Sequence, residues 1–192
     1  MRKKLLLAIG FLVGIWGYVL VLGLPSHIGA AAPQAMAPDD GITPLFSPGG
    51  GCTDAIVAEL AAATKSIDIQ AYSFTSKPIA DAVADAYDRG VHTRIILDKT
   101  QEAERASCAN YLRGRHIQVY IDDQHSLAHS KIMLIDGKVL ITGSFNFTKS
   151  SEEKNAENLL IIRNRPKLMA AYHENFEHHL SHSIPLADKA AK

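Results

Sequence analysis

The sequence of 192 residues predicts an α/β fold with a mixed, largely parallel central sheet and helices on both of its faces. Short apolar runs that suit strands alternate with segments whose apolar residues recur three or four positions apart, as in amphipathic helices. Repeated strand–helix–strand units favour parallel strands, because a covering helix carries the chain back across the sheet. The length gives room for one domain with its own core.

The first half of the chain alternates regularly between the two kinds of segment. Strands are expected at 45–47, 66–72 and 93–97, and Ile67, Ile69 and Ala71 share one face of the second. A first helix is expected to be capped by Thr53, because a threonine oxygen accepts from free amides of the first turn. Further helices are expected over 77–87 and 101–114.

The second half adds a hairpin to this pattern. A strand is expected at 117–121, followed by paired strands at 131–135 and 139–142. Asp136-Gly137 lies between the paired strands and is a strong two-residue turn signal. A strand at 157–163 and a helix over 166–182 complete the series.

The N-terminus has the composition of an export signal. Three basic residues at 2–4 precede an uncharged, largely apolar run at 5–24, and small residues follow at 29–32. Residues 1–30 are therefore interpreted as a signal peptide cleaved within 30–37. The apolar run also reaches the length of about 20 residues that spans a bilayer, so an uncleaved anchor stays open. Either alternative exports the remainder, as a periplasmic or secreted protein or one anchored to the inner membrane and facing outward.

The remaining chain divides into three parts. Residues 31–43 are rich in Ala, Pro, Gly and Asp and are expected to form a flexible linker. Residues 44–184 are expected to form a single domain, and 185–192 a tail.

The net charge argues against binding of nucleic acid by bulk electrostatic attraction. The chain carries 20 basic and 20 acidic residues, and without the three basic residues of the leader the balance is 17 − 20 = −3. Domains that bind nucleic acid by bulk electrostatics are usually basic. Any attraction for phosphate must therefore be local.

The two cysteines, Cys52 and Cys108, leave two alternatives open. An exported protein can join them in one disulfide. They can equally be two buried free thiols.

A segment from His129 to Asn146 carries the chemistry. His129 and Lys131 are two residues apart on an extended segment and so face the same side. A hairpin can bring the hydroxyl of Ser144 and the amide of Asn146 beside them. An imidazole, an ammonium and neutral donors suit a phosphate diester, because the imidazole can attack phosphorus while the donors hold the anionic oxygens.

The spacing of these residues is specific. His129-x-Lys131 is followed after four residues by Asp136, and then by Gly143-Ser144-x-Asn146 and by NAEN at 155–158. This pattern resembles the HKD motif of the phospholipase D superfamily. The stretches GSFNFTK, KNAEN and QAYSFT are most similar to the small, single-motif bacterial endonuclease branch. The resemblance implies the sandwich fold of that superfamily.

The resemblance also implies a role for each residue. His129 is the nucleophile that forms a phosphohistidine, and Glu157 is the carboxylate that hydrogen-bonds and orients it. Lys131, Ser144 and Asn146 bind the phosphate, with Lys131 and Asn146 counted among the catalytic residues. No metal ion or other cofactor is implied.

Asp136 and Gly143 belong to the motif as structural residues. Asp136 is left out of the chemical step because aspartate is common in turns without any catalytic role.

A single copy of the motif implies a homodimer with its active site on the twofold axis. One His129 attacks while the partner subunit's His129 protonates the leaving oxygen. The substrate expected first is DNA or RNA, cut without strong sequence preference. The alternative is a phospholipase D acting on phosphatidylcholine-type or cardiolipin-type headgroups, and a non-catalytic phosphate-binding module is a third hypothesis.

Two other groups of residues have weaker claims to function. His178 and His182 are four residues apart on the last helix, with His173 and His179 nearby, a spacing that can bind metal. A solvated polar helix face is preferred there, because no cysteine or carboxylate motif accompanies them. Tyr72 and Phe74 can stack on a base, but core or site-wall positions are preferred in a strand.

Overall fold

The computed structural model describes residues 41–187. The export segment 1–30 and the linker up to residue 40 lie outside the described residues. Within 41–187, no helix combines the length and the hydropathy that crossing a bilayer requires.

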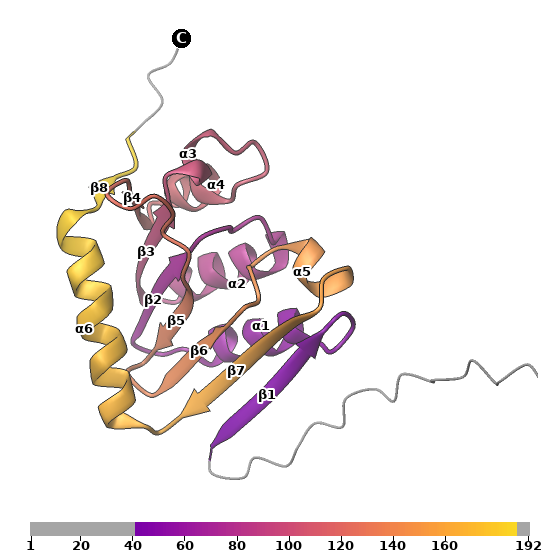
Figure 1. Ribbon diagram of the computed structural model, residues 1–192. Coiled ribbons are helices and arrows are strands. Elements are labelled where there is room, and N and C mark those ends of the chain that lie inside the picture. Colours follow the sequence, from indigo (N-terminus) through magenta and orange to yellow (C-terminus); the bar gives the residue numbers. More distant parts are fainter. Residues whose placement is uncertain (1–40, 188–192) are drawn as a thin grey trace, which may run out of the picture. The chain divides into compact units, whose positions relative to one another are not determined.

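The described residues form one eight-stranded sheet, in the order β1-β7-β6-β5-β2-β3-β4-β8 (Figure 1). Its strands are β1 (Ile42–Ser47), β2 (Ser66–Ala71), β3 (His92–Asp98), β4 (Gln118–Asp122), β5 (Lys131–Ile135), β6 (Val139–Gly143), β7 (Glu157–Arg163) and β8 (Ile184–Pro185).

The expected mixed sheet is confirmed, but the expectation of a largely parallel one is wrong. Only β2–β3 and β3–β4 pair in parallel, while the other five pairings of the described strands are antiparallel. The reason is that helical crossovers join just these two pairs. The Asp136-Gly137 hairpin turns β6 back along β5, and β7 then pairs antiparallel with β6.

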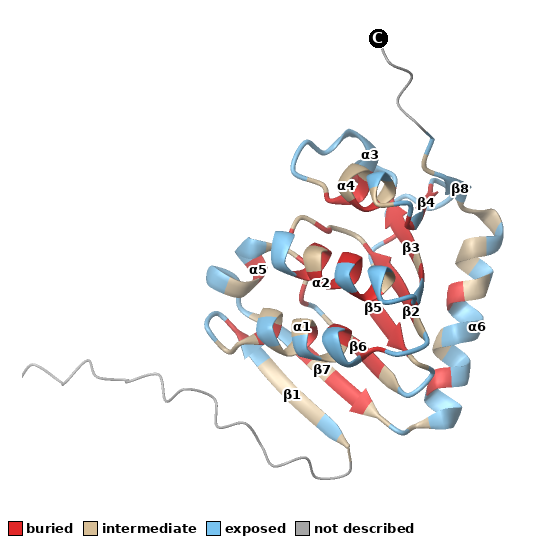
Figure 2. Cartoon of the chain, turned by 180° about the vertical axis from the view of Figure 1, so that it is seen from behind, coloured by how far each residue is buried: buried red, intermediate tan, exposed pale blue. Residues whose placement is uncertain are grey.

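Helices cover both faces of the sheet, as expected. The helices are α1 (Cys52–Ala62), α2 (Lys77–Asp88), α3 (Thr100–Ala103), α4 (Ala109–Gly114), α5 (Lys149–Glu153) and α6 (Pro166–His182). Figure 2 shows the face that α1 and α2 cover. Ile67, Ile69 and Ala71 belong to the buried core that includes residues of these two helices. On the other face, Met169 and Phe176 of α6 pack on Ile132 and Leu134 of β5.

The helix expected at 101–114 is two helices, α3 and α4. Between them, the amide of Cys108 donates to the carbonyl of Phe74 at 2.9 Å, so the backbone leaves the helical path to bond another loop. The first strand starts earlier than expected: β1 begins at Ile42, so residues 42 and 43 belong to the sheet and not to the expected linker. Two short elements were not predicted. They are β8 and the helix α5, which forms after Thr148, whose hydroxyl caps it by accepting from the amide of Ser151.

The expectation that Thr53 caps α1 is wrong. The helix begins at Cys52, so Thr53 lies inside the first turn and Gly51 is the cap residue. The carboxylate of Glu152, on α5, accepts from the amide of Gly51 at 3.2 Å and from that of Thr53 at 2.7 Å. A side chain about 100 positions later therefore satisfies amides that a helix start leaves free.

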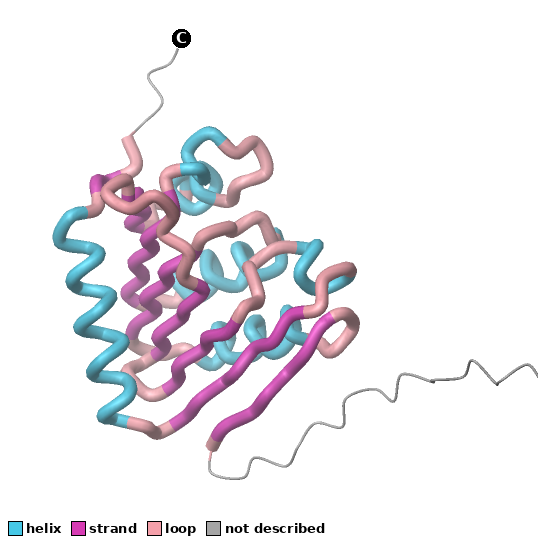
Figure 3. The backbone as a smooth tube through the Cα atoms, viewed as in Figure 1, coloured by secondary structure: helices cyan, strands magenta, loops and turns pink. Residues whose placement is uncertain are grey.

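One end of the sheet gathers the chemistry-bearing residues. β2, β3, β4 and β6 end there, while β5 and β7 begin there. The loops that follow these strand ends are drawn in Figure 3.

Candidate active site

His129 and Lys131 meet directly. The ammonium of Lys131 donates to Nδ1 of His129 at 2.8 Å and to the carbonyl of His129 at 2.7 Å. Lys131 is buried at the start of β5, whereas His129 is exposed in the preceding loop. Burial lowers the pKa of Lys131, and the negative charge of Glu157 opposes that shift. The site thus holds a cation beneath an accessible imidazole.

Tyr72 forms the wall of this pair. Its ring centroid lies 4.4 Å from that of His129, and the ammonium of Lys131 lies 5.1 Å from the centre of the tyrosine ring. The amide of Tyr72 donates to the carbonyl of Ser130 at 2.8 Å. Phe74, by contrast, is fully buried. The preferred interpretation of both aromatics, as site wall and core, agrees with these positions.

Gly143 lets the turn after β6 approach β7. Its φ is +151°, and a Cβ added to it would lie 2.3 Å from the carbonyl oxygen of Asn158. The same carbonyl accepts from the amides of Ser144, at 3.1 Å, and Phe145, at 3.2 Å. Only glycine fits this approach, and it places the Ser144 hydroxyl beside β7.

Glu157 does not bond His129 in this structure, so that part of the expected arrangement is absent. One carboxylate oxygen accepts from the Ser144 hydroxyl at 2.6 Å, and the other accepts from the Asn155 amide at 3.0 Å. Both oxygens therefore have other partners, and Nδ1 of His129 accepts from Lys131.

Asn146 lies in a loop that backbone hydrogen bonds fasten to the segment after β2. The amide of Phe147 donates to the carbonyl of Ser73, and the amide of Thr75 donates to the carbonyl of Phe147. The side-chain oxygen of Asn146 is buried and has no hydrogen-bond partner. A buried polar atom without a partner is costly, and an amide oxygen can only accept, so this atom is open to a hydrogen-bond donor.

Asp136 lies at the opposite end of β5 from Lys131. β5 has five residues, so the backbone positions of Lys131 and Asp136 are about 16 Å apart at the usual rise per strand residue. Its carboxylate accepts from the amides of Thr64, Lys65 and Ser66 and from the Thr64 hydroxyl, at 2.7–3.2 Å. Asp136 therefore joins the β5–β6 turn to the start of β2.

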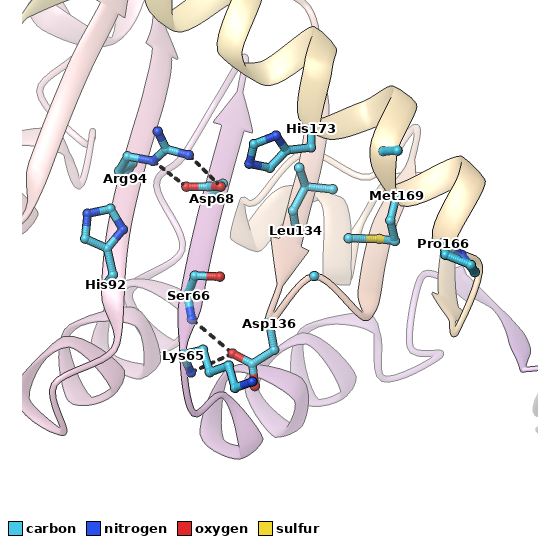
Figure 4. Close-up of a pocket in the computed structure, with 12 residues that line it drawn as sticks. Lys65, Ser66, Asp68, His92, Arg94, Leu134, Asp136, Pro166, Met169 and His173 are labelled. Atoms are coloured by element: carbon cyan, nitrogen blue, oxygen red, sulfur yellow. Dashed lines mark hydrogen bonds and ion pairs between the residues drawn. The ribbon is translucent and has the colours of Figure 1, made fainter.

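A cavity of about 490 Å³ opens at that far end, between the sheet and α6 (Figure 4). Asp136 lines it, together with the ion pair of Arg94 and Asp68. Of the motif residues only Asp136, which was expected to be structural, borders this cavity, so the cavity is separate from the His129 site.

Cys52 and Cys108 are both buried free thiols in this structure, so the disulfide alternative is not realised. The two sulfurs have different charged neighbours: Glu152 for Cys52, and Lys77 and Asp81 for Cys108. Burial raises the pKa of each thiol to about 11.

The preferred interpretation of the last-helix histidines as a solvated face is wrong for two of them. His179 and His182 face the buried carboxylate of Asp122, at the end of β4, and His125 contacts the same carboxylate. His178 remains exposed, and His173 pairs with Glu177. Burial opposes ionisation of Asp122, but hydrogen bonds from His125 and His179 outweigh it and lower the pKa to about 2.

Asp98 is a further residue of the site region that sequence reasoning missed. It is fully buried at the end of β3, and its carboxylate accepts from the amide of Ala128 at 2.7 Å and from the amide and hydroxyl of Thr100. It thereby fixes the backbone next to His129. The sequence feature that could have identified Asp98 is a carboxylate directly at the end of an apolar strand.

Comparison with known proteins identifies the family of this chain. The family described as "Cardiolipin synthase, PLD-like domain" matches residues 56–180. A phospholipase D of Rickettsia prowazekii is 40% identical over 135 residues, which are 70% of this chain and 65% of that protein. A mitochondrial cardiolipin hydrolase of Chlamydomonas reinhardtii is 34% identical over 118 residues, 62% of this chain and 52% of that protein.

A solved structure shows the same fold. Nuc of Salmonella typhimurium, a phospholipase D family member, is 33% identical, with a TM-score of 0.72 over 75% of this chain and 96% of that one. The family match spans well over half of this chain and includes every residue of the His129 site. The chain therefore belongs to the phospholipase D superfamily.

Proposed function

We propose that this protein is an exported, homodimeric phosphodiesterase that cuts nucleic acid through a phosphohistidine on His129, without a metal ion at the reacting phosphorus. The observation that carries the proposal is the 2.8 Å contact between Lys131 Nζ and His129 Nδ1 at an exposed imidazole. It puts a nucleophile and a phosphate-binding cation at one point.

The contact favours one tautomer of a neutral His129 ring. An ammonium can only donate, so Nδ1 accepts, and a neutral imidazole then carries its proton on Nε2. That tautomer suits a proton donor. Attack on phosphorus requires a free lone pair on Nε2, so the ring that attacks must carry its proton on Nδ1 instead. Substrate phosphate, by drawing the ammonium away from Nδ1, would permit this change.

The reaction divides between two histidines. Nε2 of one His129 bonds to phosphorus as the phosphorus–oxygen bond to the leaving group breaks, and the partner subunit's His129 gives its proton to the departing oxygen. Water then attacks the phosphohistidine and passes a proton to that second imidazole, which restores both rings. One chain supplies one such histidine, so the proposal requires a dimer.

Local donors meet the phosphate charge. In this proposal the ammonium of Lys131 and the side-chain N–H of Asn146 stabilise the anionic oxygens of the transition state. A net charge of −3 outside the leader favours no tight, sequence-independent grip on a long polyanion. We therefore expect modest affinity for nucleic acid and a shallow dependence of binding on salt, because few phosphates are neutralised.

Phospholipid headgroups are the second candidate substrate. Curated relatives are named phospholipase D and mitochondrial cardiolipin hydrolase. Leu127, two positions before His129, is 53% exposed, and an apolar side chain there can enter a lipid surface.

The substrate test uses the purified full chain with EDTA present. Plasmid DNA, single-stranded DNA, RNA, and vesicles of phosphatidylcholine or cardiolipin are incubated in parallel, and the His129→Ala and His92→Ala variants serve as the inactive form and its matched control. His92 lies at the start of β3, at the far end of the sheet. We expect cleaved nucleic acid with the wild type and H92A only. Headgroup release with intact DNA would reverse the order of substrates, and activity that returns only with Mg²⁺ would contradict metal-free chemistry.

The dimer is tested by mixing chains. A heterodimer of wild-type and H129A chains has only one of the two imidazoles. It should cut natural substrate at least about 100-fold more slowly than the wild type, because general acid catalysis contributes about 10²–10⁴-fold. A p-nitrophenyl phosphodiester, whose leaving group needs no proton, should react with much less loss. Full activity of the heterodimer on natural substrate would refute the two-histidine mechanism.

A further inference from the structure

Three histidines surround one buried carboxylate at the C-terminal end of α6. The side chain of Asp122 is fully buried, and it accepts from Nδ1 of His125 at 3.0 Å and from Nδ1 of His179 at 2.8 Å. Nε2 of His182 lies 3.5 Å from the same carboxylate. The four ligand atoms all lie within 4.8 Å of one another.

The spacing of these residues follows from local structure. His179 and His182 are three residues apart on α6, so they lie on the same helix face. Asp122 ends β4, and His125 follows three residues later in the loop that leads to β5. The antiparallel pairing of β8 with β4 brings the end of α6 back to this point.

Hydrogen bonds alone leave this cluster incomplete. Nε2 of His182 is buried and has no hydrogen-bond partner. The carboxylate is already shared by His125 and His179, and Gln124 donates its amide to it at 3.2 Å. If all three imidazoles were protonated, three cations would crowd one carboxylate, with ring centroids 4.9–5.3 Å apart. A cation at the centre would instead use all three nitrogen lone pairs.

We propose that Asp122, His125, His179 and His182 form a binding site for one Zn²⁺-type divalent ion. Three imidazoles and a carboxylate are a donor set that zinc accepts in tetrahedral geometry, whereas Mg²⁺ and Ca²⁺ require mostly oxygen ligands. Ligand atoms of a tetrahedral zinc lie about 3.3 Å apart. The present separations bracket that value, so small side-chain movements close the site. The exposed ring of His125 leaves a path for the ion to enter.

The site would be structural and separate from the reacting phosphorus. It would tie the end of α6 to the loop at 123–130, which carries His125 and continues to His129. Lys99 already holds this loop by donating to the carbonyl of His125 at 2.8 Å, and Asp98 holds it at Ala128. A bound ion would therefore stabilise the backbone that presents His129.

The test is metal binding by the full chain, purified without a histidine tag and stripped of metal. Co²⁺ is titrated in as the spectroscopic probe, and Zn²⁺ is then added. We expect one Co²⁺ per chain with the visible absorption of a tetrahedral site, bleached by Zn²⁺, and a Tm that rises by about 5 °C or more in excess Zn²⁺.

Variants locate the site. His125→Ala lies in an exposed loop and is not expected to impair folding, and His182→Ala removes the unpartnered nitrogen. Each should weaken Co²⁺ binding by about 100-fold or more, whereas His178→Ala, the exposed neighbour on the same helix, should bind as the wild type. Absence of stoichiometric Co²⁺ binding by the wild type would overturn the proposal. Unchanged binding by both H125A and H182A would overturn it as well.

Discussion

Lys131 holds its ammonium 2.8 Å from Nδ1 of His129 while its own side chain is buried at the start of β5. Replacing it by methionine keeps the stem and removes the charge. Loss of a preorganised charge at a transition state costs about 10²–10³-fold in rate, so we expect Lys131→Met to lose at least about 100-fold in kcat on nucleic acid. Lys138→Met, in the exposed turn at the other end of β5, is the control. A K131M enzyme with near-normal kcat would refute the role of this ammonium.

Gly143 is expected to tolerate no side chain. Its Cβ would lie 2.3 Å from the Asn158 carbonyl, so Gly143→Ala must shift the turn that carries Ser144. We expect a loss of stability of about 1–3 kcal/mol, measured by urea unfolding, with loss of activity in the folded fraction. Gly114→Ala is the control: nothing lies within 4 Å of its Cβ position in α4, and the change should be neutral or stabilising. Equal behaviour of the two variants would show that the close approach is unimportant.

Elements whose limits are marked by local signals could be predicted from the sequence. β7 and α6 have the expected bounds, because a β-branched and leucine-rich run ends at Arg163 and Pro166 suits the first turn of a helix. The spacing of His129 and Lys131 likewise predicted that the two side chains face the same side, because that spacing is local, and they are in contact in the structure. The direction of most strands could not be predicted, because it depends on which distant strands pair.

Interactions between distant segments were missed for the same physical reason. Glu152 caps α1 across 99 residues, and Asp122 meets His179 across 57. Neither pair has a sequence pattern that links its two members. The expected hydrogen bond between Glu157 and His129 also could not be checked from the sequence, because several side chains compete for the same carboxylate. In the structure, Ser144 and Asn155 donate to the Glu157 carboxylate instead.

The cap that Glu152 supplies to α1 is testable by a single change. Glu152→Gln removes the charge that accepts from the amides of Gly51 and Thr53 at the positive end of the helix. We expect about 1–2 kcal/mol of lost stability by chemical denaturation, the usual value of an N-terminal cap. Glu153→Gln, one position later and paired only with exposed Lys149, should change stability far less. If E152Q is as stable as E153Q, the long-range cap contributes nothing.

Asp136 should affect stability and leave the chemical step unchanged. Hydrogen bonds from Ser66, Lys65 and Thr64 outweigh the effect of burial and lower the pKa of its carboxyl. A carboxyl whose pKa is lower in the folded state stabilises the fold above its unfolded pKa of about 3.9, and this contribution disappears as the pH falls through the folded value. Asp136→Asn, which tolerates the φ of +55° at this position, should therefore be less stable than the wild type at pH 7 by about 1–3 kcal/mol. The two proteins should converge in stability as the pH falls below about 4, in urea unfolding measured across pH.

The kcat of folded D136N should match the wild type, because Asp136 and Lys131 occupy opposite ends of β5. A large fall in kcat with unchanged stability would instead place Asp136 in the chemistry.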